Sequence, residues 1–342
     1  MDKPLVSVLV PNYNYSRFLG ECLDSAVNQT YENLEIIILD NGSEDDSIAV
    51  ARKYLSDSRV SLCRNEINIF NRSYRTLAEA LASGKYQILL CSDDFIHKEF
   101  IEKAVRIMET YPNVGYVHGE KDLITEKGEK IYWDPFYRCS FIAPGKNAMP
   151  IYMMTTVAHP SQGVIRREAF NAAKGYDKEV DHMNADRTLW FYMSYQSDVA
   201  YIREKMCVIR IGESTETFKT QQNFQHPLLC HLTIKDFVKF AKEKELPKVY
   251  EREGAALNKL AAELLDYAAG MAHMESFEIA KNYLTYAKII SRKIVDTENY
   301  RILDDILRLK NKDDERLYKF IEKYEEKKRD YEPPDGYIEI SV

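Results

Sequence analysis

The sequence predicts an α/β fold with a mainly parallel sheet over residues 1–222, an all-α region over 223–330 and an extended tail over 331–342. Two observations lead to this organisation. Apolar, β-branched runs alternate with helical segments of about 10–15 residues through the first third of the chain, which is typical of βαβ units. After about residue 224, glycine and proline become rare and apolar residues recur at helical spacing, which indicates an antiparallel helical bundle.

The first expected strand, Val6–Val10, is a β-branched apolar run closed by Pro11. Ligands of a parallel sheet gather at the carboxyl ends of its strands, so polar residues just after the strands are candidates for a site. The expected strands lie at residues 6–10, 34–39, 59–63, 86–91 and 115–118; the expected helices lie at 18–27, 48–55, 74–82, 184–196, 228–240, 257–272, 277–287 and 302–321.

Composition sets the broad class of the protein. The chain has 342 residues, 45% of them hydrophobic and 30% charged, which is a globular balance. Its formal net charge of -7 argues against a nucleic-acid partner, because such a protein needs a basic face to displace counterions. No apolar run reaches the roughly 18 residues of a membrane span, and the N-terminus does not resemble a signal peptide. Six scattered cysteines without a CxxC pattern predict reduced thiols and a cytoplasmic location, with the inner face of the membrane as a further expectation.

Two adjacent acids, Asp93 and Asp94, follow the fourth apolar run. Burial of an unpaired carboxylate costs several kcal/mol, so the pair forms a solvated turn, caps the helix expected from Phe100, or binds a cation. Polar residues also follow two neighbouring strands, at Asn12 and at Asp40. Three polar strand ends on one edge of a sheet favour a binding site.

The order of several short motifs resembles the inverting glycosyltransferase family 2, which has the GT-A fold. The resemblance covers roughly residues 4–215 and is specific as a set, although each motif alone is weak. The motifs are Val6 to Asn14, Leu23 to Tyr31, Glu35 to Ser43, Ala82 to Tyr86, Ser92-Asp93-Asp94, Gln162 to Phe170, and Gly175-Tyr176-Asp177.

This resemblance implies a donor that is a nucleoside-diphosphate sugar and a divalent metal cofactor, Mn²⁺ or Mg²⁺. Such an ion, bound by hard oxygen ligands, stabilises the charge of the leaving diphosphate. The implied roles place Asp94 on the metal and Asp93 on the ribose or donor sugar. The other implied donor-binding residues are Pro11, Asn12, Tyr13, Asp40, Asn41, Arg75 and Arg210. The resemblance places Arg75 near the diphosphate or sugar, although Arg75 reads equally well as a solvated charge on a helix face. For Arg210 the implied contact is the diphosphate.

The acceptor hydroxyl needs a base, and the family places this acid just before an apolar helix. The segment Ala185 to Trp190 matches that position, so Asp186 is the candidate base. An acid at the start of a helix also stabilises the helix itself, and this reading of Asp186 stays open. Asp181 is the second candidate.

Several positions depart from the family pattern. Asn41 stands where relatives usually have an acid that contacts uracil. An amide can both donate and accept a hydrogen bond, so it suits uracil and also cytosine. A UDP-sugar therefore remains the leading donor, and a CDP-linked sugar is the alternative. Cys91 occupies the position of the usual first acid, and Ala185 replaces a glutamate. Gly212 stands where many relatives have a histidine that reaches the metal, and His159 and His182 are candidate substitutes.

The leading function is transfer of a sugar to an acceptor hydroxyl in surface polysaccharide, lipo-oligosaccharide or glycan synthesis, with a glycan or lipid-linked acceptor. A nucleotidyltransferase is an alternative, although the loop after the first strand lacks its glycine-rich, basic pattern. A non-catalytic binding or scaffold protein is the other alternative. The C-terminal helices are candidates for homo-oligomer contacts. The basic clusters at 310–312 and 327–329 are solvated faces or, alternatively, contacts with a membrane surface.

Overall fold

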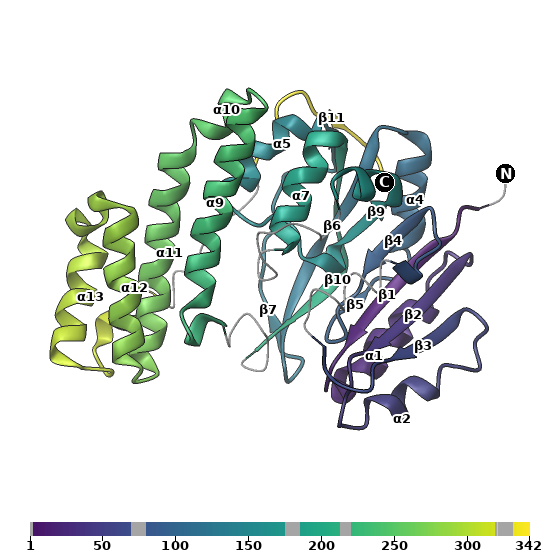
Figure 1. Cartoon of the computed structure of the whole chain (residues 1–342), viewed down its shortest axis with the longest axis horizontal. Coiled ribbons are helices and arrows are strands. Elements are labelled where there is room, and N and C mark those ends of the chain that lie inside the picture. The colour runs from purple at the N-terminus through teal and green to yellow at the C-terminus, as the bar shows by residue number, and fades with distance from the viewer. Residues whose placement is uncertain (1–2, 70–79, 175–184, 213–219, 319, 321–330) are drawn as a thin grey trace. The chain divides into compact units, whose positions relative to one another are not determined.

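The computed structural model of the chain describes residues 3–69, 80–174, 185–212, 220–318, 320 and 331–342 (Figure 1). The chain divides into two compact units. The first unit comprises residues 1–152, 156–211 and 329–342, and the second comprises 153–155 and 212–328. The boundaries expected from the sequence, at 222, 330 and 342, stay a prediction.

The first unit is an 11-stranded sheet flanked by helices. Its strands are β1 (Val6–Asn12), β2 (Leu34–Asp40), β3 (Val60–Arg64), β4 (Tyr86–Leu89), β5 (Phe95–Ile96), β6 (Val114–Thr125), β7 (Lys130–Ile131), β8 (Phe141–Ala143), β9 (Gly163–Arg166), β10 (Asp198–Ile211) and β11 (Ile338–Glu339). Its helices are α1 (Ser16–Val27), α2 (Ser47–Arg52), α4 (Phe100–Thr110), α5 (Gly145–Tyr152), α6 (Arg167–Ala172) and α7 (Ala185–Gln196), with the short 3-10 turn η1 (Pro160–Gln162).

The strands run in the order β11-β8-β10-β6-β9-β4-β1-β2-β3, with β5 paired to β10 and β7 to β6. Strands β3, β2, β1 and β4 are parallel, as are β6 and β10, whereas β9 runs antiparallel between β4 and β6. The predicted fold class is confirmed. In the parallel block the carboxyl ends of the strands lie at one edge, since Asn12 pairs with Asp40 and Asp40 with Arg64.

Successive residues of a strand point to opposite faces of the sheet. Apolar side chains therefore lie on both faces, and helices cover both. Val117 belongs to the core that contains Phe100 and Ile101 of α4. Its neighbour Tyr116 faces the other way, and its ring stacks on Trp190 of α7 at 5.0 Å between centroids. Two helix layers therefore bury the two faces of the same strand.

The C-terminal residues pair with the sheet of the first unit. Ile338 of β11 pairs with Ile142 of β8, and the main-chain N–H of Ile340 donates to the carbonyl of Ser140. Arg138 forms an ion pair with Glu332 at 2.8 Å. The segment expected to be a surface tail thus supplies the edge strand of the sheet.

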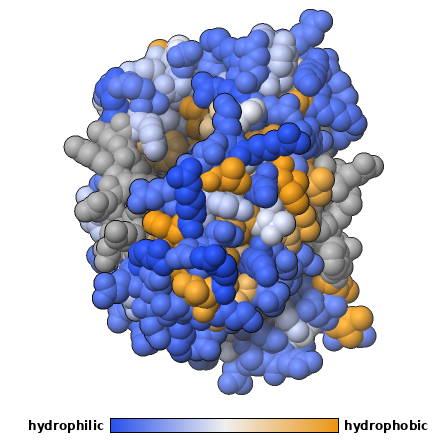
Figure 2. Space-filling model, turned by 90° about the vertical axis from the view of Figure 1, so that its left-hand side faces the viewer, coloured by the Kyte–Doolittle hydropathy of each residue, from blue (hydrophilic) through white to orange (hydrophobic). Residues whose placement is uncertain are grey.

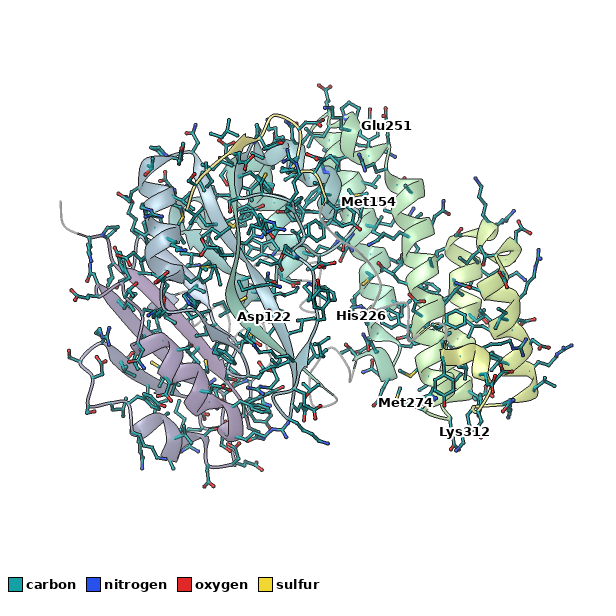
Figure 3. The ribbon with its side chains drawn as sticks, turned by 180° about the vertical axis from the view of Figure 1, so that it is seen from behind. Asp122, Met154, His226, Glu251, Met274 and Lys312 are labelled. Atoms are coloured by element: carbon teal, nitrogen blue, oxygen red, sulfur yellow. The ribbon has the colours of Figure 1, made fainter. Side chains whose placement is uncertain are left out.

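The second unit consists of helices. They are α9 (Gln225–Glu243), α10 (Pro247–Tyr250), α11 (Glu253–His273), α12 (Phe277–Ile290) and α13 (Glu298–Leu309), with 3-10 turns η3 (Arg292–Asp296) and η4 (Glu315–Leu317). Small residues such as Ala261, Ala268 and Ala272 are buried on α11, which lets neighbouring helices approach closely. His226 lies at the start of α9 (Figure 3). Its ring contacts that of Tyr267 on α11, at 5.6 Å between centroids.

No helix in the part of the chain that the structure describes is long and apolar enough to cross a membrane. The face seen in Figure 2 is mostly hydrophilic, with small separate groups of hydrophobic residues. All six cysteines lie in described segments as reduced thiols, and four of them are buried.

Candidate functional site

The ends of β1 and β2 are joined by a network of buried polar groups. The side-chain amide of Asn12 donates to Oδ2 of Asp40 at 2.9 Å and to Oγ of Ser43 at 3.1 Å. The other oxygen of Asp40 accepts from the main chain of Ser43. The guanidinium of Arg64 lies 3.7 Å from the Asp40 carboxylate, and half of the Arg64 side chain is exposed. The network fixes the strand ends. The Arg64 guanidinium beside them is a cation that the sequence analysis did not single out.

Asn41 uses its whole amide to hold the loop that follows β3. Its NH₂ group donates to Oδ1 of Asn68 at 2.8 Å and to the carbonyl of Ile69 at 2.9 Å. Its oxygen accepts from Asn65 and from the main chain of Ile69. Two donors and two acceptor sites satisfy this amide, and the side chain is buried. Asn41 therefore anchors the 65–69 loop in this structure.

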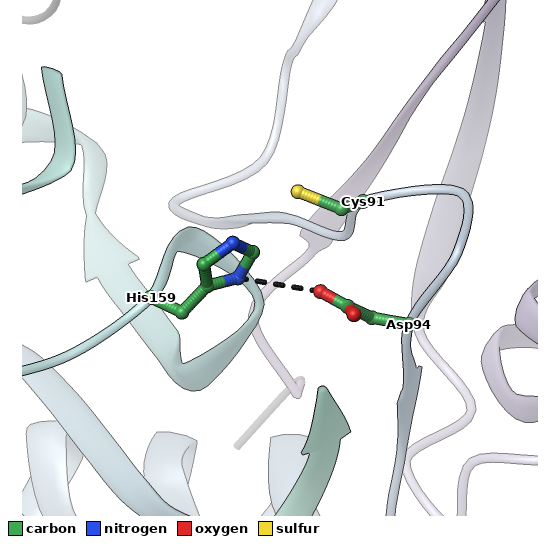
Figure 4. Close-up of side chains that lie close together, drawn as sticks. All are labelled: Cys91, Asp94 and His159. Atoms are coloured by element: carbon green, nitrogen blue, oxygen red, sulfur yellow. Dashed lines mark ion pairs between the residues drawn. The ribbon is translucent and has the colours of Figure 1, made fainter. Parts of the chain in front are cut away.

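The Asp94 carboxylate is fully buried and held by residues from distant parts of the chain. Oδ1 accepts from the main-chain N–H of Arg210 at 3.0 Å, and Oδ2 accepts from the hydroxyl of Ser161 at 2.6 Å. Nδ1 of His159 lies 3.2 Å from the same Oδ2 (Figure 4). Ser161 also accepts from the main chain of Cys91, so it joins both ends of the turn. Ser161 carried no signal in the sequence beyond its place next to a family motif.

Asp93 differs sharply from its neighbour. No hydrogen bond from another described side chain reaches its carboxylate, and burial together with the nearby Asp94 raises the pKa of Asp93 to about 7. For His159, burial acts to lower the pKa, but the Asp94 carboxylate outweighs it and the pKa is raised. The ligand atoms of Asp94, His159 and Cys91 lie within 4.8 Å of one another and form a donor set that fits a divalent cation, whereas Asp93 is not part of this group.

Arg210 at the end of β10 contacts protein groups with its whole guanidinium. Nε donates to the carbonyl of Asp93 at 3.0 Å, and Nη2 forms an ion pair with Glu21 of α1 at 2.5 Å. Its guanidinium also stacks over Phe18 at 4.2 Å. The structure thus shows Arg210 supporting the Asp93-Asp94 turn; the predicted contact with a diphosphate stays a prediction.

Helix α7 brings Asp186 to the His159 side of the site. The indole N–H of Trp190 donates to the carbonyl of Ala158 at 2.9 Å, which fixes α7 against the segment just before His159. Asp186 lies four residues before Trp190 and therefore on the same helix face. Its carboxylate contributes to the raised pKa of His159 and also accepts from the main chain of Arg187, as a helix-start acid does.

Close packing of α7 requires glycine at position 163. A Cβ atom there would lie 2.4 Å from the ring of Trp190. The glycine of the Gln162 to Phe170 motif therefore has a packing role that positions the helix of Asp186.

The structure brings together most of the predicted residues at one edge of the sheet. Pro11 is partly buried and Tyr13 is 38% exposed beside the Asn12 network. Arg75, Asp181 and His182 lie outside the described residues, as does the Gly175-Tyr176-Asp177 motif. Sequence reasoning missed Glu21, Arg64 and Ser161, because their contacts join segments far apart in sequence.

Comparisons with known proteins find both similar sequences and similar structures. The family model described as Glycosyl transferase family 2 matches residues 7–172. Residues 7–172 of the chain therefore resemble glycosyl transferase family 2. The expected resemblance is confirmed, and the Asn12, Asp40 and Asp94 groups all lie within the matched family 2 segment.

A curated relative from Haemophilus influenzae, an "Uncharacterized glycosyltransferase", is 36% identical over 109 residues, which are 32% of this chain and 44% of that protein. The chain therefore aligns with less than half of that relative's length.

Among solved structures, S. aureus TarS 1-349 in complex with UDP-GlcNAc is similar, with a TM-score of 0.58, 16% identity, and coverage of 89% of this chain and 91% of that one. The mannosyltransferase PcManGT from Pyrobaculum calidifontis, in complex with GDP-Man and Mn²⁺, has a TM-score of 0.52, 17% identity, and coverage of 96% and 89%. At these identities the likeness concerns the fold.

Proposed function

We propose that this protein is an inverting, metal-dependent glycosyltransferase that moves a sugar, of the hexosyl type, from a nucleoside diphosphate to an acceptor hydroxyl. The observation that carries the proposal is the Asp94 carboxylate, which Ser161 and Arg210 fix at the carboxyl edge of a family 2 sheet beside the Asn12–Asp40 network. Core packing does not explain a buried carboxylate of this kind, because burying its charge costs free energy.

The donor nucleotide is proposed to bind over the strand ends of β1 and β2. Pro11, Asn12, Tyr13 and Asp40 line this edge, and the exposed cation of Arg64 adds positive charge beside it. Solved structures with this fold hold UDP-GlcNAc in one case and GDP-Man in another, so the fold alone leaves the base open. A UDP-sugar is the leading donor. The saturated amide of Asn41 gives no support to a cytosine contact.

The residues around Asp94 are proposed to hold a divalent cation, Mn²⁺ or Mg²⁺ in the first instance, as the solved PcManGT complex holds Mn²⁺. A bound ion would supply Lewis-acid stabilisation of the charge on the leaving diphosphate. The Asp93 carboxylate, next in the chain, is proposed to bind the ribose or the donor sugar. Arg210 positions both acids through its main chain and side chain.

Asp186 is the proposed base. Its carboxylate would take the proton of the acceptor hydroxyl as that oxygen forms a bond to the anomeric carbon. The bond from that carbon to the phosphate oxygen breaks, and its electron pair leaves with the diphosphate. Attack opposite the leaving group inverts the anomeric centre. Trp190 and Gly163 hold the helix that presents Asp186.

The acceptor is proposed to be a growing glycan or a lipid-linked saccharide of surface polysaccharide, lipo-oligosaccharide or glycan synthesis. In this proposal the protein works in the cytoplasm or at the inner face of the membrane. The helical unit is proposed to serve acceptor binding or homo-oligomer formation.

The decisive experiment is a screen of UDP-, GDP-, CDP- and TDP-sugars for release of nucleoside diphosphate and, with saccharide acceptors, for a mass gain of one sugar. We expect metal-dependent turnover of one donor class and an inverted anomeric proton signal in the product. Binding of nucleotides without hydrolysis or transfer of any sugar would instead support the scaffold alternative.

A further inference from the structure

Three side chains of different chemistry converge beside the Asp turn. Cys91, Asp94 and His159 each offer one ligand atom, and these atoms lie within 4.8 Å of one another. Figure 4 shows the three side chains directed toward a common point. We propose that these residues form a mixed sulfur, oxygen and nitrogen cation site, so that the protein prefers a softer first-row ion such as Zn²⁺ or Co²⁺ to Mg²⁺. This inference deepens the proposed function and rests on it for the role of the ion in sugar transfer.

The main chains of the two new ligands are fixed by buried neighbours. The N–H of His159 donates to the side chain of Gln162 at 2.8 Å, and Gln162 in turn donates to the carbonyl of Gly119 at 2.9 Å. The N–H of Cys91 donates to Ser161 at 3.0 Å, and the Cys22 thiol donates to the Cys91 carbonyl at 3.5 Å. Both ligand residues are thus held before an ion arrives, which lowers the ordering cost of binding.

The His159 ring is placed to share an ion with Asp94. Its Nδ1 is buried and lies 3.2 Å from Oδ2 of Asp94. Two ligands of a tetrahedral zinc ion, at metal distances of about 2.0–2.3 Å, lie about 3.3–3.8 Å apart. The three atoms, which lie within 4.8 Å of one another, would therefore approach one another by at most about 1.5 Å to bind one ion.

The chemistry of the donors sets the preference. Thiolate and imidazole ligands select zinc and cobalt, whereas carboxylate, carbonyl and water oxygens suit magnesium and calcium. Cys91 stands where the resemblance to family 2 leads one to expect an acid, so this chain offers a sulfur atom in place of carboxylate oxygens. His159, the residue before η1, supplies an imidazole. The position at which many relatives carry their histidine is Gly212, about 50 residues later in the chain. Binding converts the Cys91 thiol to a thiolate and releases one proton.

The test is a titration of the metal-free protein with Co²⁺ alone, followed by absorption spectroscopy. Sulfur coordination to cobalt gives an intense near-ultraviolet charge-transfer band that oxygen and nitrogen ligands do not produce. We expect this band in the wild type and in the control Cys63→Ser, whose thiol is also half-buried but lies on β3. Cys91→Ser should lose the band, and His159→Gln should weaken cobalt binding by about tenfold or more.

A second measurement uses the unaltered protein, so that a misfolded variant does not decide the matter. Alkylation of Cys91 by iodoacetamide, mapped by mass spectrometry, should slow at least about tenfold in Zn²⁺ but not in Mg²⁺ at the same concentration. Alkylation of Cys63 should be unchanged by either ion. Cobalt binding without the charge-transfer band, or equal alkylation of Cys91 in both ions, would overturn the inference.

These outcomes are independent of the sugar-transfer screen. A cobalt band together with no turnover of any nucleotide sugar would preserve the metal site and refute the transferase. Turnover supported equally by Mg²⁺ and Zn²⁺, without the band, would preserve the transferase and refute the mixed site.

Discussion

The main-chain N–H of Arg210 donates a hydrogen bond to Oδ1 of Asp94 at 3.0 Å, although the two residues are 116 positions apart. The side chain of the same arginine donates to the carbonyl of Asp93 and forms an ion pair with Glu21. One residue therefore fixes both acids of the turn, once through its main chain and once through its guanidinium. Arg210 therefore positions the two acids, and this role is separate from any contact with substrate.

Arg210→Lys should weaken metal and nucleotide binding by about tenfold, because lysine keeps the main-chain hydrogen bond but not the contact with the Asp93 carbonyl. Isothermal titration calorimetry with metal and UDP measures the effect. Arg17→Lys is the matched control, since Arg17 also stacks on Phe18 but forms its ion pair with Glu126. Equal losses in the two variants would show that charge near Phe18 matters and the Asp93 contact does not.

Asn41→Asp, which restores the residue usual in family 2, should lower the free energy of unfolding by about 1–3 kcal/mol. The new carboxylate would face the oxygens of Asn68 and Ile69, which now accept from the Asn41 amide. Chemical denaturation measures the loss. Asn311→Asp should be nearly neutral, because that side chain is exposed and its oxygen accepts from the main chain of Asp313, as a carboxylate also can. A more stable Asn41→Asp protein would contradict the proposed anchoring of the 65–69 loop.

Asp186→Asn should reduce kcat by about 10²–10⁴ while nucleotide binding stays within about twofold, because the amide cannot take a proton. The measurement is initial rate against donor concentration. Glu168→Gln alters an acid in the first turn of another helix, α6, and should leave kcat unchanged. A variant at position 186 that turns over at the wild-type rate would leave Asp186 only its helix-start role.

His118 should make stability depend on pH. Burial, with a smaller effect of Lys121, lowers the pKa of His118 to about 3, and its ring packs between Tyr116 and Tyr201. Below about pH 6.5 the unfolded chain binds a proton that the folded protein does not bind until about pH 3. The free energy of unfolding should therefore fall as pH decreases through this window, by up to about 1.4 kcal/mol per pH unit.

Urea unfolding of the metal-free protein at several pH values between about 4 and 7 measures this slope. His118→Gln should flatten it, whereas His97→Gln, which removes an exposed imidazole, should not. An unchanged slope in His118→Gln would assign the pH dependence to other groups.

The sequence predicted the alternation of strands and helices because burial imposes a local period, and the parallel strands β1 to β4 follow that prediction. It placed Asn12 and Asp40 at strand ends and Asp94 shortly after β4, where the structure has them. It did not predict that the C-terminal tail would supply an edge strand, since Ile338–Glu339 is too short to show a period. The assigned roles of the site residues stay predictions.

Hydrophobic periodicity and turn residues are local patterns that span about ten positions of the sequence. The sequence by itself therefore determined which residue types follow each strand. Only the tertiary structure decided the partners: Ser161 and Arg210 on Asp94, the 65–69 loop on Asn41, and Cys91 beside His159. These contacts depend on how strands that are distant in sequence pair with one another. Arg210 lies on β10, where a slip of one residue in the register would turn its side chain to the other face.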